Sequence, residues 1–199
     1  NKNKFNAATY IPCSLDEARF LPKKSHHNQK KITIGWTGTF SSKPYLDSIR
    51  DTLRSACLKL DLKLILITNF DYSIQDIDME VIQWKENTEI EDLQKIDIGL
   101  YPVIPSSWAL GKGGLKVLQY MAVGIPSIST NFGTAAEIVS NGVDGFLADS
   151  SSEWIEKISL LVNDKNLRKN MGLNGRNKII EKYSVSAVSK SYLSILNNN

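Results

Sequence analysis

The chain has 199 residues, of which 42% are hydrophobic and 23% charged, a balance typical of a soluble globular domain that buries its core without disulfides or metal ions. The formal net charge of +3, without a basic stripe of interleaved aromatics, argues against nucleic-acid binding, and no apolar run of about 18 residues predicts a membrane-spanning helix. The first residues are polar and lack the apolar core of a signal peptide, so we expect a cytoplasmic location.

Residues 1–30 contain turn-forming and charged residues without helical or alternating periodicity. We interpret them as a linker that offers one extended strand at most. The pair His26 and His27 has no third ligand at a suitable spacing, so we expect solvated linker histidines rather than a metal site. The two cysteines, Cys13 and Cys57, lie outside any CxxC spacing, and we expect both to be reduced thiols.

Residues 31–199 alternate between short apolar runs and segments with helical spacing. In chain order we expect a strand at 31–38, a helix at 43–60, strands at 62–68 and 79–84, a helix at 90–96, a strand at 97–103, a helix at 115–124, strands at 125–130 and 145–149, and helices at 152–162, 167–182 and 186–196. The run LKLILIT is typical of a strand buried on both faces of a parallel sheet. The order predicts an α/β fold with a Rossmann-like, doubly wound parallel sheet.

Ligands of an open parallel α/β sheet bind beside the carboxyl ends of the strands. The turn after the first expected strand, at 35–43, contains a GxxG pair that lets backbone amides approach a ligand, with hydroxyls and a lysine close behind. Gly38, Thr39 and Lys43 are therefore candidates for anion binding. A tight strand-to-helix turn capped by serine and threonine explains the same residues equally well, so both interpretations stay open.

The stretch GKGGLKVLQ at 111–119 carries a stronger signal. Gly113 and Gly114 precede a helix, where the free amides and the helix dipole favour an anion. Lys112 lies just before the helix start, and Lys116 shares one helix face with Gln119. The simpler alternative is a solvated face of an amphipathic helix. We favour a phosphate, because a central helix of a doubly wound sheet is exposed only near the ligand cleft.

The opposite face of this helix is expected to bury Leu115, Leu118 and Ala122. At the end of a neighbouring strand, Trp84 and Lys85 lie on the same rim of the sheet, where a tryptophan either stacks on a base or closes the edge of the core. The carboxylates form no visible acid/base pair, and we expect Glu137 to belong to a helix start.

Five motifs follow one another in an order that resembles the C-terminal half of the family 4 glycosyltransferases. They read YIPCSLDEARFLP, IGWTGTFSSKPYL, DIGLYP, GKGGLKVLQYMAVGIPSISTNFGTAAEIVSNGVDGFLAD and EKYS. Members of that family are retaining enzymes of GT-B architecture, in which two Rossmann-like domains face a cleft. The resemblance covers nearly the whole chain and is most specific over 111–149. It implies that 1–30 cross between the domains and that 31–199 form the nucleotide-sugar-binding domain with its C-terminal helices.

By this resemblance, the chain is the donor-binding half of a retaining, metal-independent glycosyltransferase without a cofactor, and it is expected to be inactive alone. The donor is expected to be a UDP- or GDP-linked sugar. A glycan or lipid-linked acceptor is expected on an N-terminal domain. The family also suggests polysaccharide biosynthesis, with peripheral contact at the inner face of the membrane. Because the last GT-B helix crosses to the other domain, we expect an uncovered apolar stripe made of Val185, Val188, Tyr192 and Leu196.

The resemblance also implies a role for each candidate residue. Lys112 and Lys116 are expected to be catalytic, because they stabilise the leaving diphosphate. The residues expected at the donor diphosphate are Gly38, Thr39, Lys43, Gly113, Gly114 and Leu115. Gln119 is expected at the ribose and Trp84 and Lys85 at the base, with no metal ligand.

The sequence departs from the family pattern in two ways. Family members carry two glutamates eight positions apart, and Gly111 and Gln119 occupy those positions here. Thr39 stands where an arginine is usual, and Lys43 matches a usual lysine only with a one-residue shift. The positive charge is therefore expected to have moved to the two lysines beside the glycine pair.

Two other functions stay open. A nucleotide-binding module that has lost transfer chemistry and partners an active glycosyltransferase fits the missing glutamate at Gly111. A nucleotide-sugar epimerase of the same architecture is the second. A dehydrogenase is disfavoured, because the first turn lacks GxGxxG with an acidic residue about 20 positions later.

Overall fold

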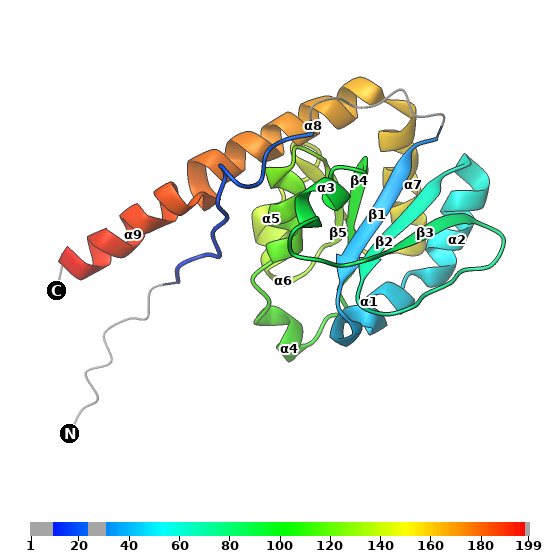
Figure 1. Ribbon diagram of the computed structural model, residues 1–199, viewed down its shortest axis with the longest axis horizontal. Helices are drawn as coiled ribbons and strands as arrows, with labels where there is room; N and C mark the ends of the chain where they lie inside the picture. Colours follow the sequence, from blue (N-terminus) through cyan, green and yellow to red (C-terminus); the bar gives the residue numbers. More distant parts are fainter. Residues whose placement is uncertain (1–9, 24–30, 198–199) are drawn as a thin grey trace.

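Figure 1 shows the computed structural model of the chain, in which residues 10–23 and 31–197 are described. These residues form a six-stranded parallel sheet in the order β3-β2-β1-β4-β5-β6. The strands are β1 (Thr33–Gly38), β2 (Lys63–Thr68), β3 (Asp78–Gln83), β4 (Ile98–Tyr101), β5 (Ser127–Thr130) and β6 (Gly145–Ala148). The strand order reverses between β1 and β4, as in a doubly wound sheet, and the predicted Rossmann-like fold is confirmed.

Helices connect most of the strands, and the last three helices follow β6. The helices are α1 (Lys43–Asp47), α2 (Arg50–Leu60), α3 (Glu89–Leu93), α4 (Ser107–Leu110), α5 (Leu115–Ala122), α6 (Gly133–Ile138), α7 (Ser151–Asn163), α8 (Lys165–Lys178) and α9 (Val185–Asn197), with a 3₁₀ turn at Phe40–Ser42 and a π turn at Ile179–Tyr183. The expected continuous helix at 43–60 is wrong. The Ser48 hydroxyl donates to the Tyr45 carbonyl at 2.7 Å, and Ile49 leaves helical geometry, so the helix breaks there.

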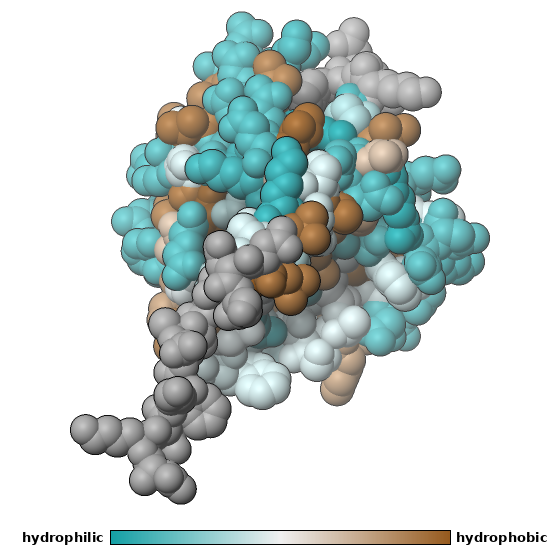
Figure 2. All heavy atoms as spheres, turned by 90° about the vertical axis from the view of Figure 1, so that its left-hand side faces the viewer, coloured by the Kyte–Doolittle hydropathy of each residue, from teal (hydrophilic) through white to brown (hydrophobic). Residues whose placement is uncertain are grey.

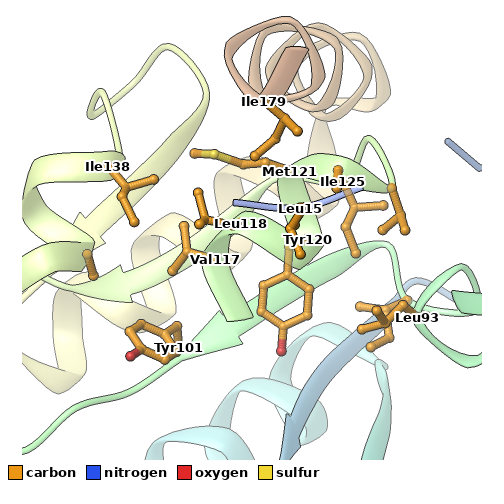
Figure 3. Packing of buried hydrophobic residues seen from close by; sticks show 14 of the residues in the cluster. Leu15, Leu93, Tyr101, Val117, Leu118, Tyr120, Met121, Ile125, Ile138 and Ile179 are labelled. Carbon is orange, nitrogen blue, oxygen red and sulfur yellow. The ribbon is translucent and has the colours of Figure 1, made fainter. Parts of the chain in front are cut away.

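Each face of the sheet is covered by its own hydrophobic cluster. Ile65 and Ile67 of β2 belong to the cluster that includes α5, whereas Leu64 and Leu66 belong to the cluster that includes α2 and α7. Both pairs are buried, which explains the continuous apolar run of this strand. The helix residues that pack on the α5 side include Leu93, Val117, Leu118, Met121 and Ile138, shown in Figure 3.

A buried tyrosine lies where the two halves of the sheet separate. β1 pairs with β4 only at Ile34 and Gly35, and beyond this point the Tyr120 hydroxyl bridges the two strands. It accepts a hydrogen bond from the Thr37 amide at 3.1 Å and donates one to the Leu100 carbonyl at 3.2 Å. Figure 3 shows the Tyr120 ring pointing from α5 toward the strands. The side chain thus satisfies backbone groups that the diverging strands cannot pair.

The described part of the expected linker packs against the domain. The Leu15 amide donates to the Tyr183 carbonyl at 2.9 Å. The Arg176 guanidinium donates to the carbonyls of Glu17, Phe20 and Ala122, at 2.8, 2.6 and 2.9 Å. These bonds join the N-terminal segment, α5 and α8 (Figure 1). The expected linker histidines at 26 and 27 lie outside the described residues.

Helix α9 extends away from the sheet (Figure 1). Of its expected apolar stripe, Val188 is buried, whereas Val185, Tyr192 and Leu196 are 51%, 54% and 68% exposed. Figure 2, turned so that this side faces the viewer, shows hydrophobic side chains among hydrophilic ones. Of these four residues only Val188 is therefore covered, and the stripe is otherwise open as expected.

Removal of the Tyr120 hydroxyl is expected to destabilise the fold. In Tyr120→Phe the Thr37 amide and the Leu100 carbonyl lose their partner inside the core, which should lower the free energy of unfolding by about 1–3 kcal/mol. Urea unfolding measures this loss. Tyr192→Phe, on exposed α9, is the matched control and should leave stability unchanged. Equal stability of the Tyr120→Phe variant and the wild type would contradict the bridging role.

Candidate functional site

A cavity of about 440 Å³ opens at the carboxyl edge of the sheet, between the β1 end and the start of α5. Most of the expected site residues line it, namely Gly38, Thr39, Trp84, Lys112, Gly113, Gly114, Leu115, Lys116 and Gln119. Four lining residues were missed, namely Thr37, Asn69, Glu89 and Tyr101. The structure thus brings together residues that are up to 82 positions apart in the sequence, from Thr37 to Gln119.

The start of α5 presents free backbone amides to this cavity. Gly114 is the N-cap residue, with φ +67° and no side chain to cap the helix. Only glycine adopts this conformation readily, and a Cβ there would also overlap Ile138. The first amides of a helix have no intrahelical acceptor, and they carry the positive end of the helix dipole. This helix start can therefore bind an anion.

Two lysines add charge at the same place. The Lys112 ammonium lies 4.9 Å from the centre of the Tyr45 ring. Lys116 is partly buried in the first turn of α5, and burial, followed by repulsion from Lys112, lowers the pKa of its ammonium. Among the described residues, no carboxylate forms an ion pair with either lysine. Both ammonium groups therefore line the cavity without an ion-pair partner among these residues.

The Leu115 side chain is exposed, although it was expected to be buried. Leu118 and Ala122 are fully buried, as expected, but Leu115 is 46% exposed and lines the cavity. The reason is its position as the first residue of α5, immediately after the glycine pair, where the helix surface borders open space rather than the sheet. Its backbone amide belongs to the free amides of the helix start.

The Glu89 carboxylate of α3 lies beside Gln119, which follows Lys116 by about one helical turn. The Gln119 side chain, 8% exposed, donates through Nε2 to Glu89 Oε1 at 3.0 Å. The Trp84 indole donates to the same oxygen at 3.2 Å. Glu89 was missed as a site residue, although Trp84 and Lys85, shortly before it in the sequence, were expected on the same rim of the sheet. Its signal was its place at the start of a helix on this rim, not a motif.

Two expected site residues lie outside the cavity. The Lys43 ammonium pairs with Asp47 at 2.8 Å, one turn along α1, and lies 5.4 Å from the centre of the Tyr72 ring. Lys85 is exposed beyond β3. The structure therefore does not bring these two lysines to the other candidates, and their expected roles stay predictions. Glu137 lies in α6, but near the end of this helix rather than at its start as expected.

Two features of other classes of protein, a cluster of metal ligands and a membrane-spanning helix, are absent from the described residues. Over 10–23 and 31–197, no three His, Cys, Asp or Glu side chains gather as metal ligands. Within the same residues, no helix has the length and apolarity required to cross a bilayer.

Part of the sequence is similar to a known protein family and to several of its members. A family model described as "Glycosyl transferases group 1" matches residues 74–178. The capsular polysaccharide biosynthesis glycosyltransferase CapM of Staphylococcus aureus is 33% identical over 89 residues, which are 44% of this chain and 23% of CapM. Sucrose synthase of Melioribacter roseus is 34% identical over 88 residues, which are 41% of this chain and 11% of that enzyme. The matched stretches thus span less than a quarter of these relatives.

Solved structures share the fold. The C-terminal domain of the group 1 family protein LpcC from Francisella tularensis superposes with a TM-score of 0.69 at 20% identity, covering 86% of this chain and 99% of that domain. Anabaena HepE, solved in complex with UDP and glucose, superposes with a TM-score of 0.72 at 14% identity, covering 95% of this chain and 56% of HepE. The described domain therefore shares its fold with the LpcC C-terminal domain and with about half of HepE.

Burial of the Lys116 ammonium has a consequence for stability. The folded-state pKa lies below the unfolded value of about 10.4, so protonation opposes folding. Lys116→Met should therefore be more stable than the wild type at pH 7 without ligand, and the difference should shrink as pH rises from the folded-state pKa toward the unfolded one. Urea unfolding between pH 7 and 10.5 measures it. Lys169→Met, on the exposed face of α8, is the control and should show no such trend. A less stable Lys116→Met would contradict the cost assigned to this lysine.

Proposed function

The chain belongs to the group 1 glycosyltransferases, and from this premise we propose that it is the donor-binding domain of a retaining glycosyltransferase that transfers without a metal ion. The proposed donor is a sugar linked to a nucleoside diphosphate, UDP or GDP. The proposed acceptor, a glycan or a lipid-linked molecule, is bound by a further domain across the cleft. A cytoplasmic location beside the inner face of the membrane belongs to the same proposal.

One observation carries the proposal. Lys112 and Lys116 lie without carboxylate partners around the free amides of α5, on a cavity large enough for a nucleotide. A helix start that follows a glycine pair attracts phosphate by hydrogen bonds and by its dipole. An ammonium buried beside another ammonium is unfavourable unless an anion compensates both. A diphosphate at this position supplies two such charges.

The rest of the cavity suits the remainder of a nucleotide. Gln119, one turn along α5, and Glu89 of α3, which accepts its hydrogen bond, offer polar groups where the ribose is proposed to lie. The Trp84 ring is 42% exposed at the cavity rim and held by its indole hydrogen bond, which suits stacking on a base. HepE, whose structures contain UDP and UDP-glucose, supports a nucleoside diphosphate donor.

The proposed transfer needs electrostatic stabilisation rather than a strong base. The bond between the anomeric carbon and the β-phosphate oxygen breaks, and its electron pair leaves with the nucleoside diphosphate. The acceptor hydroxyl oxygen bonds the same face of that carbon, and its proton passes to the departing diphosphate. The Lys112 and Lys116 ammonium groups and the amides of α5 oppose the negative charge that develops on the leaving group.

Nucleotide binding by the 199-residue chain tests this proposal. UDP or GDP at about 100 times its Kd should add roughly 2.7 kcal/mol of stability, which raises the thermal midpoint by about 5–10 °C. The shift should be the same with and without magnesium, and it should vanish in the double variant Lys112→Ala/Lys116→Ala. Lys169→Ala removes an equal charge from α8 and should bind as the wild type does.

Two results would oppose the proposal. If millimolar UDP, GDP, ADP and CMP all leave the thermal midpoint unchanged, the proposal that this chain binds the donor is contradicted. A shift that persists in the Lys112→Ala/Lys116→Ala variant but disappears without magnesium would replace the lysine site by a metal-dependent one.

A further inference from the structure

We propose that Glu89 is the residue that recognises the ribose, by accepting hydrogen bonds from its two hydroxyls, and that Trp84 and Gln119 are positioning residues for this carboxylate. The inference rests on the proposed function, because it assigns one end of the same cavity. It also changes the role expected for Gln119, which then holds the acceptor group instead of binding the ribose itself.

The hydrogen bonds of Glu89 leave one oxygen available. Both donors, the Trp84 indole at 3.2 Å and the Gln119 amide at 3.0 Å, reach Oε1. In the part of the chain that the structure describes, no donor reaches Oε2 and no lysine or arginine forms an ion pair with the carboxylate. Two neutral groups thus fix the carboxylate without neutralising it, and its second oxygen can accept from a ligand.

The position of Glu89 separates it from the phosphate end. Gln119 follows Leu115 by four residues, which is about 6 Å along a helix axis. The carboxylate bound to Gln119 therefore lies about one turn away from the amides that suit the diphosphate. In a nucleoside diphosphate the ribose is joined directly to the α-phosphate, so its hydroxyls can reach this part of the cavity while the phosphates remain at the glycine pair.

The chemistry of this position selects a diol. A carboxylate inside a cavity whose other ionised groups are Lys112 and Lys116 repels phosphate, so it contributes to binding only by accepting hydrogen bonds. Neighbouring 2′ and 3′ hydroxyls are two such donors, and acidic side chains accept from ribose hydroxyls in other Rossmann-like nucleotide sites. A ligand without the hydroxyls offers Oε2 no donor, so it forgoes these two hydrogen bonds and binds more weakly.

Calorimetric titration of the 199-residue chain with three ligands tests the inference. The ligands are uridine diphosphate, its 2′,3′-dideoxy analogue and inorganic pyrophosphate, with the guanosine pair used if guanosine diphosphate binds more tightly. The wild type should bind the ribose form about tenfold or more tightly than the dideoxy form. Glu89→Gln should abolish this preference without weakening the binding of the dideoxy form or of pyrophosphate, because it removes a charge that repels phosphate. Trp84→Phe removes one positioning donor and should reduce the preference in part.

The outcomes separate the two proposals. Equal binding of ribose and dideoxy forms by the wild type, or a Glu89→Gln variant that keeps the preference, overturns the role of Glu89 while donor binding stands. An equal loss for all three ligands in Glu89→Gln assigns a structural role to Glu89 and also overturns it. Failure of every ligand, pyrophosphate included, to bind the folded wild type contradicts the proposed function and this inference with it. An unliganded unfolding midpoint of Glu89→Gln equal to the wild-type value verifies that the variant is folded.

Discussion

The Tyr120 hydroxyl occupies the point at which β1 and β4 separate, accepting from the Thr37 amide at 3.1 Å and donating to the Leu100 carbonyl at 3.2 Å. Parallel strands that diverge leave backbone groups unpaired, and unpaired groups inside a core cost free energy. The tyrosine satisfies both groups and so allows the sheet to open toward the cavity. Gly99 is part of this arrangement, because a Cβ at that position would overlap the tyrosine ring.

Helix α5 links this packing to the site. Its buried side, including Val117 and Met121, anchors the helix in the core, while its first turn borders the cavity. The same turn carries Lys116, although a cation is unfavourable at a helix start and burial lowers its pKa. Stability and anion binding therefore place opposite demands on one residue, and the rigid attachment of α5 keeps the charged turn in place.

Much of the fold follows from local patterns. The apolar run of β2 and the end of α5 at Gly124, with φ +74°, are both readable from the sequence. The break at Ser48 depends on one side-chain hydrogen bond that spacing does not reveal. Lys43 was expected in the cavity because it closely follows the glycine turn, but its ammonium pairs with Asp47, four residues further along α1. Glu89 enters the site through tertiary contacts, and no local motif marks it.

Amide chemical-shift mapping during titration with inorganic pyrophosphate tests most directly the central claim, that the start of α5 binds the donor diphosphate. The account predicts the largest shifts at the amides of 113–116, where the glycine pair meets α5. The amides around Lys43 and Arg50, two basic residues whose side chains both lie near the Tyr72 ring, should stay unaffected. Largest shifts at those amides, or no shifts at the start of α5, would contradict the account.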